Sequence, residues 1–357
     1  KLFENFVLNA TVIGGNMEAD NEEKYNCNIP WAILLDPTSA CNKHCVGCWA
    51  AEYGSQLNLT YDEMSSIVSQ GKAMGTFMYL FTGGEPLVRK DLEVCGRAFY
   101  DRGFPWGIVT NGLALTPARY KSLLQSGLRS MTISLDGIGA THDWMRGLPG
   151  VFERAISAIN MVASSGEIEF DVVTCVNKRS YKELDRIKEL LIENGLKEWR
   201  LFTVFPVGRA ASDPELKLSP EEFRGTMDFI KATRKEGRIK ASYGCEGFLG
   251  KYEGDVRDHF FLCNAGLTVG SVMADGSIAA CPSIRADYSQ GNIYDGDDFM
   301  DVWNNKFQNM RNRSWAKVEN CAKCKNWRWC EGNGLHLHKD DHSECAYCNL
   351  ELLENKI

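Results

Sequence analysis

With 357 residues, 44% of them apolar and 24% charged, the chain has the composition of a soluble globular protein of about two domains. No apolar run reaches the roughly 20 residues of a membrane span, and a net charge of −7 without a basic stripe argues against nucleic acid as the main partner. Fourteen cysteines without an export signal argue against a disulfide framework and predict metal ligation in the reducing cytoplasm.

Residues 1–30 are expected to form an N-terminal extension. Apolar residues between positions 2 and 13 predict one face of a short helix that packs against the fold that follows, with contact to a membrane or lipid as the alternative. The charged run 18–24 is expected to be a solvated linker.

From residue 31 the chain alternates apolar strand-like runs with helical segments, which is the pattern of a parallel α/β fold. Strands are expected at 31–36, 77–82, 106–110, 130–135, 169–176 and 198–205. Six strands with their crossovers fit a partial (β/α)6 TIM-like barrel over residues 31–240. In such a barrel the active site gathers at the C-terminal ends of the strands.

Several helix starts are readable in the sequence. Thr60 with Glu63 and Ser180 with Glu183 have the spacing of a capping box. Ser219 precedes a proline, which predicts a cap followed by proline at the first helical position.

Three cysteines, Cys41, Cys45 and Cys48, directly follow the first expected strand. Thiolates at this spacing can wrap one metal or cluster on a single loop. Because a four-iron cluster takes four ligands, three thiolates leave one iron open for chemistry. A disulfide or a zinc site is the alternative interpretation of the same triplet.

The C-x3-C-x2-C triplet resembles the cluster motif of the radical S-adenosylmethionine (SAM) superfamily. Gly83-Gly84-Glu85-Pro86, at the end of the second expected strand, is similar to a second hallmark of that family. The resemblance implies a [4Fe–4S] cluster whose open iron binds SAM, and reductive cleavage of SAM to a 5′-deoxyadenosyl radical that abstracts hydrogen from an unactivated carbon. It also implies a flavodoxin- or ferredoxin-like reductant and an anaerobic setting.

The same resemblance implies a set of SAM contacts at the ends of the strands. The two glycines bring the backbone to the amino group of SAM, the third strand end holds a ribose or carboxylate, and an arginine clamps the SAM carboxylate. A plain turn and a surface salt bridge are the alternatives for the last two. The residues are Gly83, Gly84, Glu85, Pro86, Trp49, Thr110, Asn111, Ser134, Asp136, Arg146 and Arg209.

Cys175 lies on the fifth expected strand. A strand cysteine of this kind is expected to be a small core residue. The alternative is a catalytic role, in which an inward-pointing thiol donates a hydrogen atom to a substrate radical.

Residues 241–357 are rich in cysteine and are expected to form a smaller domain with a β-hairpin turning at Asp275-Gly276. The hairpin would bring Cys263 and Cys281 together. This region resembles the SPASM/twitch extension of radical SAM enzymes, which carries auxiliary iron–sulfur clusters. Gly334 stands where the extension has a further cysteine.

The resemblance implies one or two auxiliary [4Fe–4S] clusters. The first site would use Cys245, Cys263 and Cys281; it is incomplete, carries an open iron, or borrows Cys345. The second would use Cys321, Cys324, Cys330 and Cys348. A zinc tetrathiolate of Cys321, Cys324, Cys345 and Cys348 is the rival interpretation. His336 and His338 are expected to lie on the surface or behind the ligands.

These patterns favour a radical SAM enzyme that modifies a peptide or protein side chain. One alternative is coupling or modification of a lipid, an isoprenoid or another non-peptide substrate, because the apolar N-terminal segment keeps membrane association open. An iron–sulfur electron-transfer protein without SAM chemistry is the alternative from a different class.

Overall fold

The computed structural model describes residues 14–48, 56–205, 208–284, 288–338, 345 and 347–354. Its strands form one sheet in the order β10-β9-β8-β1-β2-β3-β4-β5-β6-β7. The strands are β1 (Ala32–Leu35), β2 (Met78–Phe81), β3 (Trp106–Thr110), β4 (Leu128–Ser134), β5 (Glu169–Val176), β6 (Glu198–Thr203), β7 (Lys240–Tyr243), β8 (Val269–Val272), β9 (Ser277–Ala279) and β10 (Gly291–Asn292).

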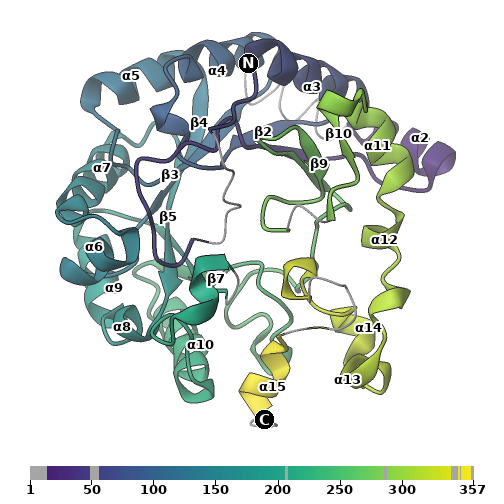
Figure 1. The fold of residues 1–357 in the computed structure, drawn as a ribbon. Helices are drawn as coiled ribbons and strands as arrows, with labels where there is room; N and C mark the ends of the chain where they lie inside the picture. The colour runs from purple at the N-terminus through teal and green to yellow at the C-terminus, as the bar shows by residue number, and fades with distance from the viewer. Residues whose placement is uncertain are drawn as a thin grey trace.

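Helices cover the outside of the curved sheet (Figure 1). They are α2 (Gly14–Tyr25), α3 (Tyr61–Met74), α4 (Leu92–Asp101), α5 (Pro117–Gln125), α6 (Ala140–Arg146), α7 (Val151–Ser165), α8 (Lys178–Tyr181), α9 (Leu184–Glu193), α10 (Pro220–Glu236), α11 (Phe299–Lys306), α12 (Gln308–Arg311), α13 (Glu319–Ala322), α14 (Trp327–Cys330) and α15 (Asn349–Glu354). Short 3-10 turns are η2 (Pro86–Val88), η3 (Gly208–Ser212), η4 (Gly250–Tyr252), η6 (Ile293–Asp295), η7 (Ser314–Ala316) and η8 (Leu335–Leu337).

The partial TIM-like barrel is confirmed. All six expected strands are present, each parallel to its neighbour from β1 to β6. The structure adds one strand that the sequence did not reveal, β7, which extends the sheet beyond β6. It also shows that β8, the first strand of the expected hairpin, pairs in parallel with β1. The barrel remains open, because β7 and β10 are the two ends of the sheet.

The core lies between the sheet and its helices. Side chains of alternate strand residues point outward into this layer; Tyr79 and Phe81 of β2 are 1% exposed, and the Tyr79 hydroxyl donates to the Val68 carbonyl of α3. Phe81 stacks on Phe99 of α4 with ring centroids 5.3 Å apart. Burial of large apolar side chains contributes roughly 1.5–3 kcal/mol each, so this layer holds the barrel wall in place.

The helix ends largely follow the sequence. Thr60 and Glu63 form the capping box expected for α3, and Ser219 caps α10 ahead of Pro220. The capping box expected at Ser180 is wrong, because Asn177 caps α8 and Ser180 is its third residue. Residues 18–24 form part of α2, largely exposed, rather than a linker.

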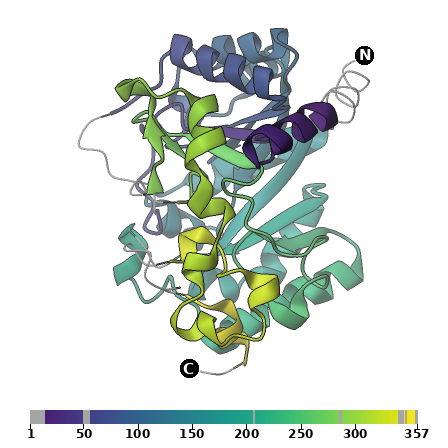
Figure 2. The ribbon, with the colours of Figure 1, turned by 90° about the vertical axis from the view of Figure 1, so that its right-hand side faces the viewer.

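The cysteine-rich C-terminal region continues the barrel sheet. The hairpin of β8 and β9 turns at Gly276, whose φ of +80° suits glycine. Beyond it, α11 packs against α3 and α15 against α10, so the region closes around one side of the barrel (Figure 2). The division at residue 240 stays a prediction, and the sheet runs across it.

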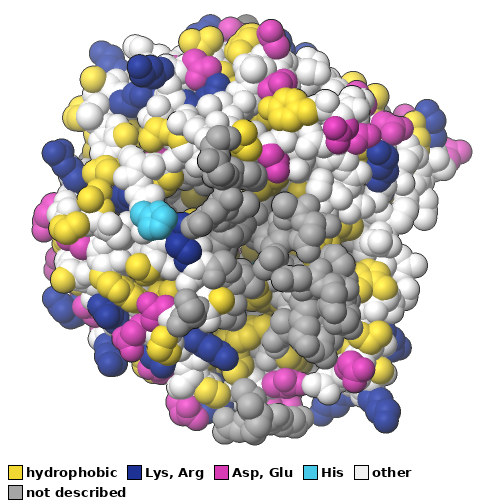
Figure 3. Space-filling view, viewed as in Figure 1, with side chains coloured by type: hydrophobic (Ala, Val, Ile, Leu, Met, Phe, Trp, Pro, Cys, Tyr) yellow, Lys and Arg dark blue, Asp and Glu magenta, His cyan; other side chains and the backbone are white. Residues whose placement is uncertain are grey.

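The surface carries charges of both signs. On the face seen in Figure 3, basic and acidic side chains are interspersed around the rim of the described surface. None of the helices in the described ranges is both long and apolar enough to cross a membrane.

Candidate active site

The loop that carries Cys41, Cys45 and Cys48 follows β1 at the carboxyl end of the barrel strands. Cys41 is exposed, and Cys45 and Cys48 are half-buried. The surrounding protein still desolvates the Cys41 thiol enough to raise its pKa, and the charges of Cys45, Glu85 and Cys48 raise it further. This mutual effect shows that the three thiols lie close together.

The Gly-Gly-Glu-Pro segment is hydrogen-bonded to the start of this loop. The Gly84 amide donates to the Thr38 carbonyl at 3.0 Å, and the Glu85 amide donates to the Ala40 carbonyl at 2.8 Å. A Cβ on Gly84 would lie 2.2 Å from the Ala40 oxygen. The glycine at 84 is therefore required where two protein segments meet, whereas the sequence attributed it to the approach of SAM.

Glu85 connects this segment to the third strand. Its carboxylate is 1% exposed and accepts hydrogen bonds from the Thr110 hydroxyl at 2.6 Å, the Asn111 amide at 2.8 Å and the Leu87 amide at 3.0 Å. Burial raises the pKa of Glu85, and these three donors oppose that rise. The Thr110 hydroxyl is thus committed to Glu85.

The Asn111 side chain reaches the cluster loop. Its Nδ2 donates to Asn42 Oδ1 at 2.8 Å. Asn42 lies between the first two cysteines of the loop, so the ends of β2 and β3 and the cluster loop form one hydrogen-bonded unit.

Arg146 and Asp136 form an ion pair beneath the loop. Asp136 is fully buried after β4, Arg146 ends α6, and the two charged groups are in contact. Arg146 Nη1 also lies 3.8 Å from Cys45 Sγ. The predicted SAM clamp therefore already has a carboxylate partner in the protein and contacts a cluster thiol.

His142 and Arg209 hold the same region from two sides. His142 Nδ1 accepts the Asp136 backbone amide at 3.0 Å, and burial lowers the pKa of this fully buried imidazole to about 2, with the Arg146 and Lys43 charges adding to the effect. Arg209 Nε donates to the Cys45 carbonyl at 3.1 Å. Two of the residues assigned to SAM, Arg146 and Arg209, thus also position the cluster loop.

Lys43 is a residue that the sequence did not single out. Its Nζ is buried and has no hydrogen-bond partner in the described part of the chain. Desolvation and the nearby Arg146 charge together lower the pKa of Lys43 to about 8. A cation between the first two cysteines fits an anionic cluster and the carboxylate of SAM.

Cys175 lies on β5, and its backbone amide donates to Asp136 Oδ1 at 2.9 Å. Its side chain packs beside Met145 and Val204, which agrees with a core position. Burial raises the pKa of Cys175, and Asp136 adds to the rise, so the group is a thiol. Whether it donates hydrogen stays a prediction.

Ser134 ends β4 nearby and is 8% exposed, and Trp49 lies outside the described residues.

A polar network crosses the inner face of the barrel below these strand ends. The Thr132 hydroxyl donates to Asp171 Oδ1 at 2.6 Å, and Arg200 contacts both, with Nη2 3.0 Å from the Thr132 hydroxyl. The Arg200 side chain is 42% exposed. A cation accessible from the barrel interior can bind an anionic group of a substrate.

The first auxiliary group of cysteines brings together Cys245, Cys263 and Cys281. Burial raises the pKa of Cys281 to about 12, and the charges of Cys245 and Cys263 contribute. Burial raises the pKa of Cys245 to about 11, with Cys263 as the next cause. Cys245, which follows β7, thus lies near Cys263 and Cys281 on either side of the hairpin, and these are the three thiols that the sequence assigned to the first auxiliary site.

The second group holds five cysteines. Burial raises the pKa of Cys330 to about 12, with charges of Cys348, Cys345 and Cys321 adding to it. Burial is the main cause that raises the pKa of Cys321, and the charges of Cys348 and Cys324 follow in that order. The thiol of Cys345 thus belongs with this second group, which has one thiol more than a four-iron cluster takes.

The spacing of these groups bears on the choice of metal. Four sulfurs that bind one zinc at about 2.3 Å would lie within about 4 Å of each other. Among the described residues, no three His, Cys, Asp or Glu side chains are arranged around a single ion. Thiols gathered three or more to a group are the donors that iron–sulfur clusters take.

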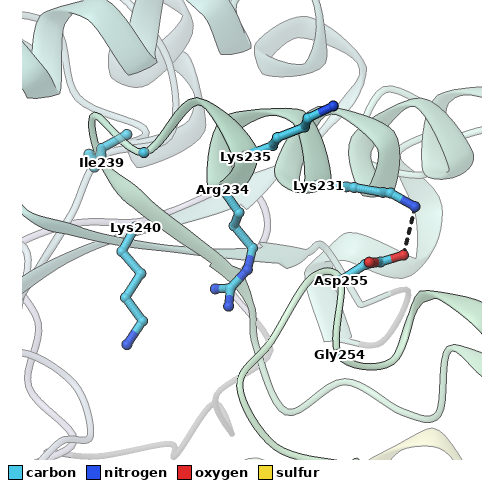
Figure 4. A pocket seen from close by; sticks show the side chains of 8 residues that line it. Lys231, Arg234, Lys235, Ile239, Lys240, Gly254 and Asp255 are labelled. Carbon is cyan, nitrogen blue, oxygen red and sulfur yellow. Dashed lines mark hydrogen bonds and ion pairs between the residues drawn. The ribbon is translucent and has the colours of Figure 1, made fainter.

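A separate cavity of about 490 Å³ lies at the end of α10, next to the start of β7 (Figure 4). Two of its cations have protein partners: Lys231 pairs with Asp255 at 2.7 Å, and Lys240 pairs with Asp258 at 2.7 Å. It opens at the amino end of β7, whereas the cluster loop lies at the carboxyl ends of the strands. The cavity is thus outside the candidate active site.

Two family models match the chain. The model described as the Radical SAM superfamily matches residues 35–191, and the SPASM model, described as an iron–sulfur cluster-binding domain, matches residues 263–325. The chain therefore belongs to the radical SAM superfamily. Within this class it is an enzyme with a SPASM-type C-terminal domain, and it binds SAM and iron–sulfur clusters.

Curated relatives extend over most of the chain. The AdoMet-dependent heme synthase of Methanosarcina barkeri is 29% identical over 325 residues, which cover 85% of this chain and 91% of the relative. The mycofactocin maturase MftC of Mycolicibacterium smegmatis is 27% identical over 311 residues, 85% of this chain and 77% of the relative.

Solved structures show the same fold. Streptococcus suis SuiB bound to S-adenosylmethionine has a TM-score of 0.74 at 18% identity, and the match covers 97% of this chain and 82% of SuiB. This likeness supports the barrel and its C-terminal region as one architecture.

Proposed function

We propose that this enzyme cleaves SAM reductively at the Cys41–Cys45–Cys48 loop and abstracts hydrogen from a carbon of a substrate inside the barrel. When bound, the cluster and SAM supply the one-electron cleavage that gives methionine and the 5′-deoxyadenosyl radical. The observation that carries the proposal is the hydrogen-bonded unit of Gly84, Glu85 and Asn111, which holds the start of the cysteine loop, residues 38–42, at the strand ends.

Lys43 and Arg146 have different roles at this site. Arg146 is paired with Asp136, so its main role is to hold the loop. Lys43 Nζ has no partner among the described residues, and we assign to it the SAM carboxylate. In Lys43→Met, the KM for SAM is expected to rise about tenfold or more, which corresponds to about 1.4 kcal/mol per factor of ten, while the iron content stays unchanged.

The substrate is proposed to carry a carboxylate that binds Arg200. A charge-assisted bond to the half-exposed guanidinium is worth roughly 1.5–3 kcal/mol. A peptide is the first source of such a group, supported by the mycofactocin maturase and PqqA peptide cyclase relatives. A tetrapyrrole is the second, supported by relatives named AdoMet-dependent heme synthase and Fe-coproporphyrin III synthase.

The first experiment tests SAM cleavage. Protein reconstituted without oxygen is mixed with dithionite and SAM, and 5′-deoxyadenosine is measured by chromatography. Cleavage is expected in the native enzyme and absent from the Cys41/Cys45/Cys48→Ala variant, named here the radical-site triple variant. Lack of cleavage in native enzyme that holds its full complement of iron would refute the proposal.

The second experiment tests the substrate. Deuterated Fe-coproporphyrin III and deuterated peptides with acidic side chains are offered separately, and deuterium is measured in 5′-deoxyadenosine. Transfer from one of them identifies the source, and Arg200→Gln is expected to raise its KM at least tenfold. Transfer that is insensitive to Arg200→Gln would remove the carboxylate contact from the proposal while leaving hydrogen abstraction intact.

A further inference from the structure

Position 334 is glycine where the SPASM pattern has a cysteine, yet the space beside it is filled. A Cβ on Gly334 would lie 2.8 Å from Cε1, 3.0 Å from Nδ1 and 3.7 Å from Nε2 of His336. The imidazole of His336 therefore occupies the volume into which a side chain at 334 would project. The sequence placed His336 on the surface or behind the ligands, and the structure shows it half-buried.

This position adjoins the first auxiliary group. The guanidinium of Arg313 donates to the carbonyls of Asn333 at 3.2 Å and of Cys263 at 2.8 Å, which brings residues 333 and 263 to one buried cation. The Asn333 side chain accepts the Phe248 amide at 3.0 Å, and its Oδ1 would lie 2.3 Å from a Cβ on Gly247.

Residue 333 therefore lies between two cysteine-bearing segments, since Gly247 is two residues beyond Cys245. Cys281 is coupled by charge to both Cys245 and Cys263. The backbone just before Gly334 thus lies beside the backbone of Cys263, while Asn333 Nδ2 lies 3.9 Å from Sγ of Cys345 in the second group.

The ring of His336 is available for ligation. It packs at 65° against Phe205, with centroids 5.2 Å apart, and neither ring nitrogen has a hydrogen bond to a described residue. His338 differs, because its Nε2 is 2.6 Å from the Gly332 carbonyl. Cys345 is coupled to the second group, and its Sγ lies 3.1 Å from the Tyr347 carbonyl.

We propose that the imidazole of His336 is the fourth ligand of the first auxiliary cluster, together with Cys245, Cys263 and Cys281. The histidine takes the place of the cysteine that Gly334 removes. A neutral imidazole in place of a thiolate makes the cluster less negative and raises its reduction potential, as histidine ligation does in other iron–sulfur centres. The proposal concerns the auxiliary site and is independent of SAM cleavage.

The test uses the radical-site triple variant, which retains only the auxiliary sites, labelled with ¹⁵N-histidine and reduced. Pulsed electron paramagnetic resonance is expected to show a strongly coupled histidine nitrogen. The coupling is expected to vanish in His336→Cys, while the iron content stays the same and the potential of the first auxiliary cluster falls. In Gly334→Cys/His336→Ala, the cysteine is expected to restore the full iron content that His336→Ala lacks.

Two results would overturn the assignment. One is the absence of histidine nitrogen coupling in protein with full auxiliary iron, which would leave the fourth iron open or bound by another group. The other is coupling that persists in His336→Cys, which would assign the nitrogen to a different histidine. Iron retained at the second auxiliary site shows that each variant is folded, so loss of coupling is not mistaken for unfolding.

Discussion

Replacing Gly84 by alanine tests whether the Gly-Gly-Glu-Pro segment holds the cluster loop. The added Cβ would lie 2.2 Å from the Ala40 oxygen and 2.8 Å from the Ser39 oxygen, so the two segments must separate by about 1 Å to reach ordinary contact. The bonds from the Gly84 and Glu85 amides, now 3.0 and 2.8 Å, would then exceed hydrogen-bond range. Two lost backbone bonds cost about 2–4 kcal/mol.

The assay is iron content with thermal unfolding. Gly84→Ala is expected to lose the iron of the radical site, to keep the auxiliary iron, and to match the iron content of the radical-site triple variant. Gly166→Ala is the control, because Gly166 has open space around its Cβ position; its φ of +61° adds a backbone strain that Gly84 does not have. That control should keep all its iron. Native iron content and SAM cleavage in Gly84→Ala would refute the structural role of this glycine.

Further predictions concern the buried charges and the second auxiliary site. Burial lowers the pKa of His142 to about 2, whereas the unfolded imidazole titrates near 6.5, so only the unfolded state takes up this proton as the pH falls. The free energy of unfolding should therefore drop by about 2 kcal/mol between pH 7.5 and 5. Urea unfolding of His142→Gln should lack this loss. Arg146→Met should cost about 3–5 kcal/mol by leaving Asp136 buried and unpaired, and adding Asp136→Asn should recover most of it in the same measurement. Cys345→Ser should keep the iron of the second auxiliary site and Cys348→Ser should lose it, as measured by iron analysis, because a four-iron cluster takes four of the five thiols.

Each of these predictions has a contrary result. An unchanged pH dependence in His142→Gln would show that other groups dominate acid unfolding. A double variant as unstable as Arg146→Met would mean that packing, not charge, holds Arg146. Loss of iron in Cys345→Ser but not in Cys348→Ser would make Cys345, rather than Cys348, the fourth ligand of the second cluster.

The sequence predicted the barrel well where local patterns are strong. Apolar runs located six strands, and the cap at Thr60 is visible because both partners are three residues apart. β7 was missed because it has only four residues, among them Lys240 and Ser242, and so lacks an apolar run. The pairing of β8 with β1 was missed because it joins residues more than 230 positions apart, which no local pattern encodes.

The sequence identified many of the residues of the site but not the hydrogen bonds between them. The motif residues Glu85, Thr110 and Asn111 were each linked to SAM, whereas the structure shows that they bond to each other. Lys43 was overlooked because a lone lysine in a loop is ordinarily solvated; only its lack of a partner in the folded chain distinguishes it. The contact of His336 with Gly334 depends on the course of the backbone over three residues and has no sequence signal.

The parallel pairing of β8 with β1 has a consequence for how the chain can be divided. β1 is hydrogen-bonded to β2 on one side and to β8 on the other, with four residues in register on each. A chain cut ahead of β8 would expose the backbone of β1 as an open edge, and such an edge recruits strands from other molecules. The C-terminal region is therefore also a cover for the barrel, and a barrel expressed without it is expected to aggregate.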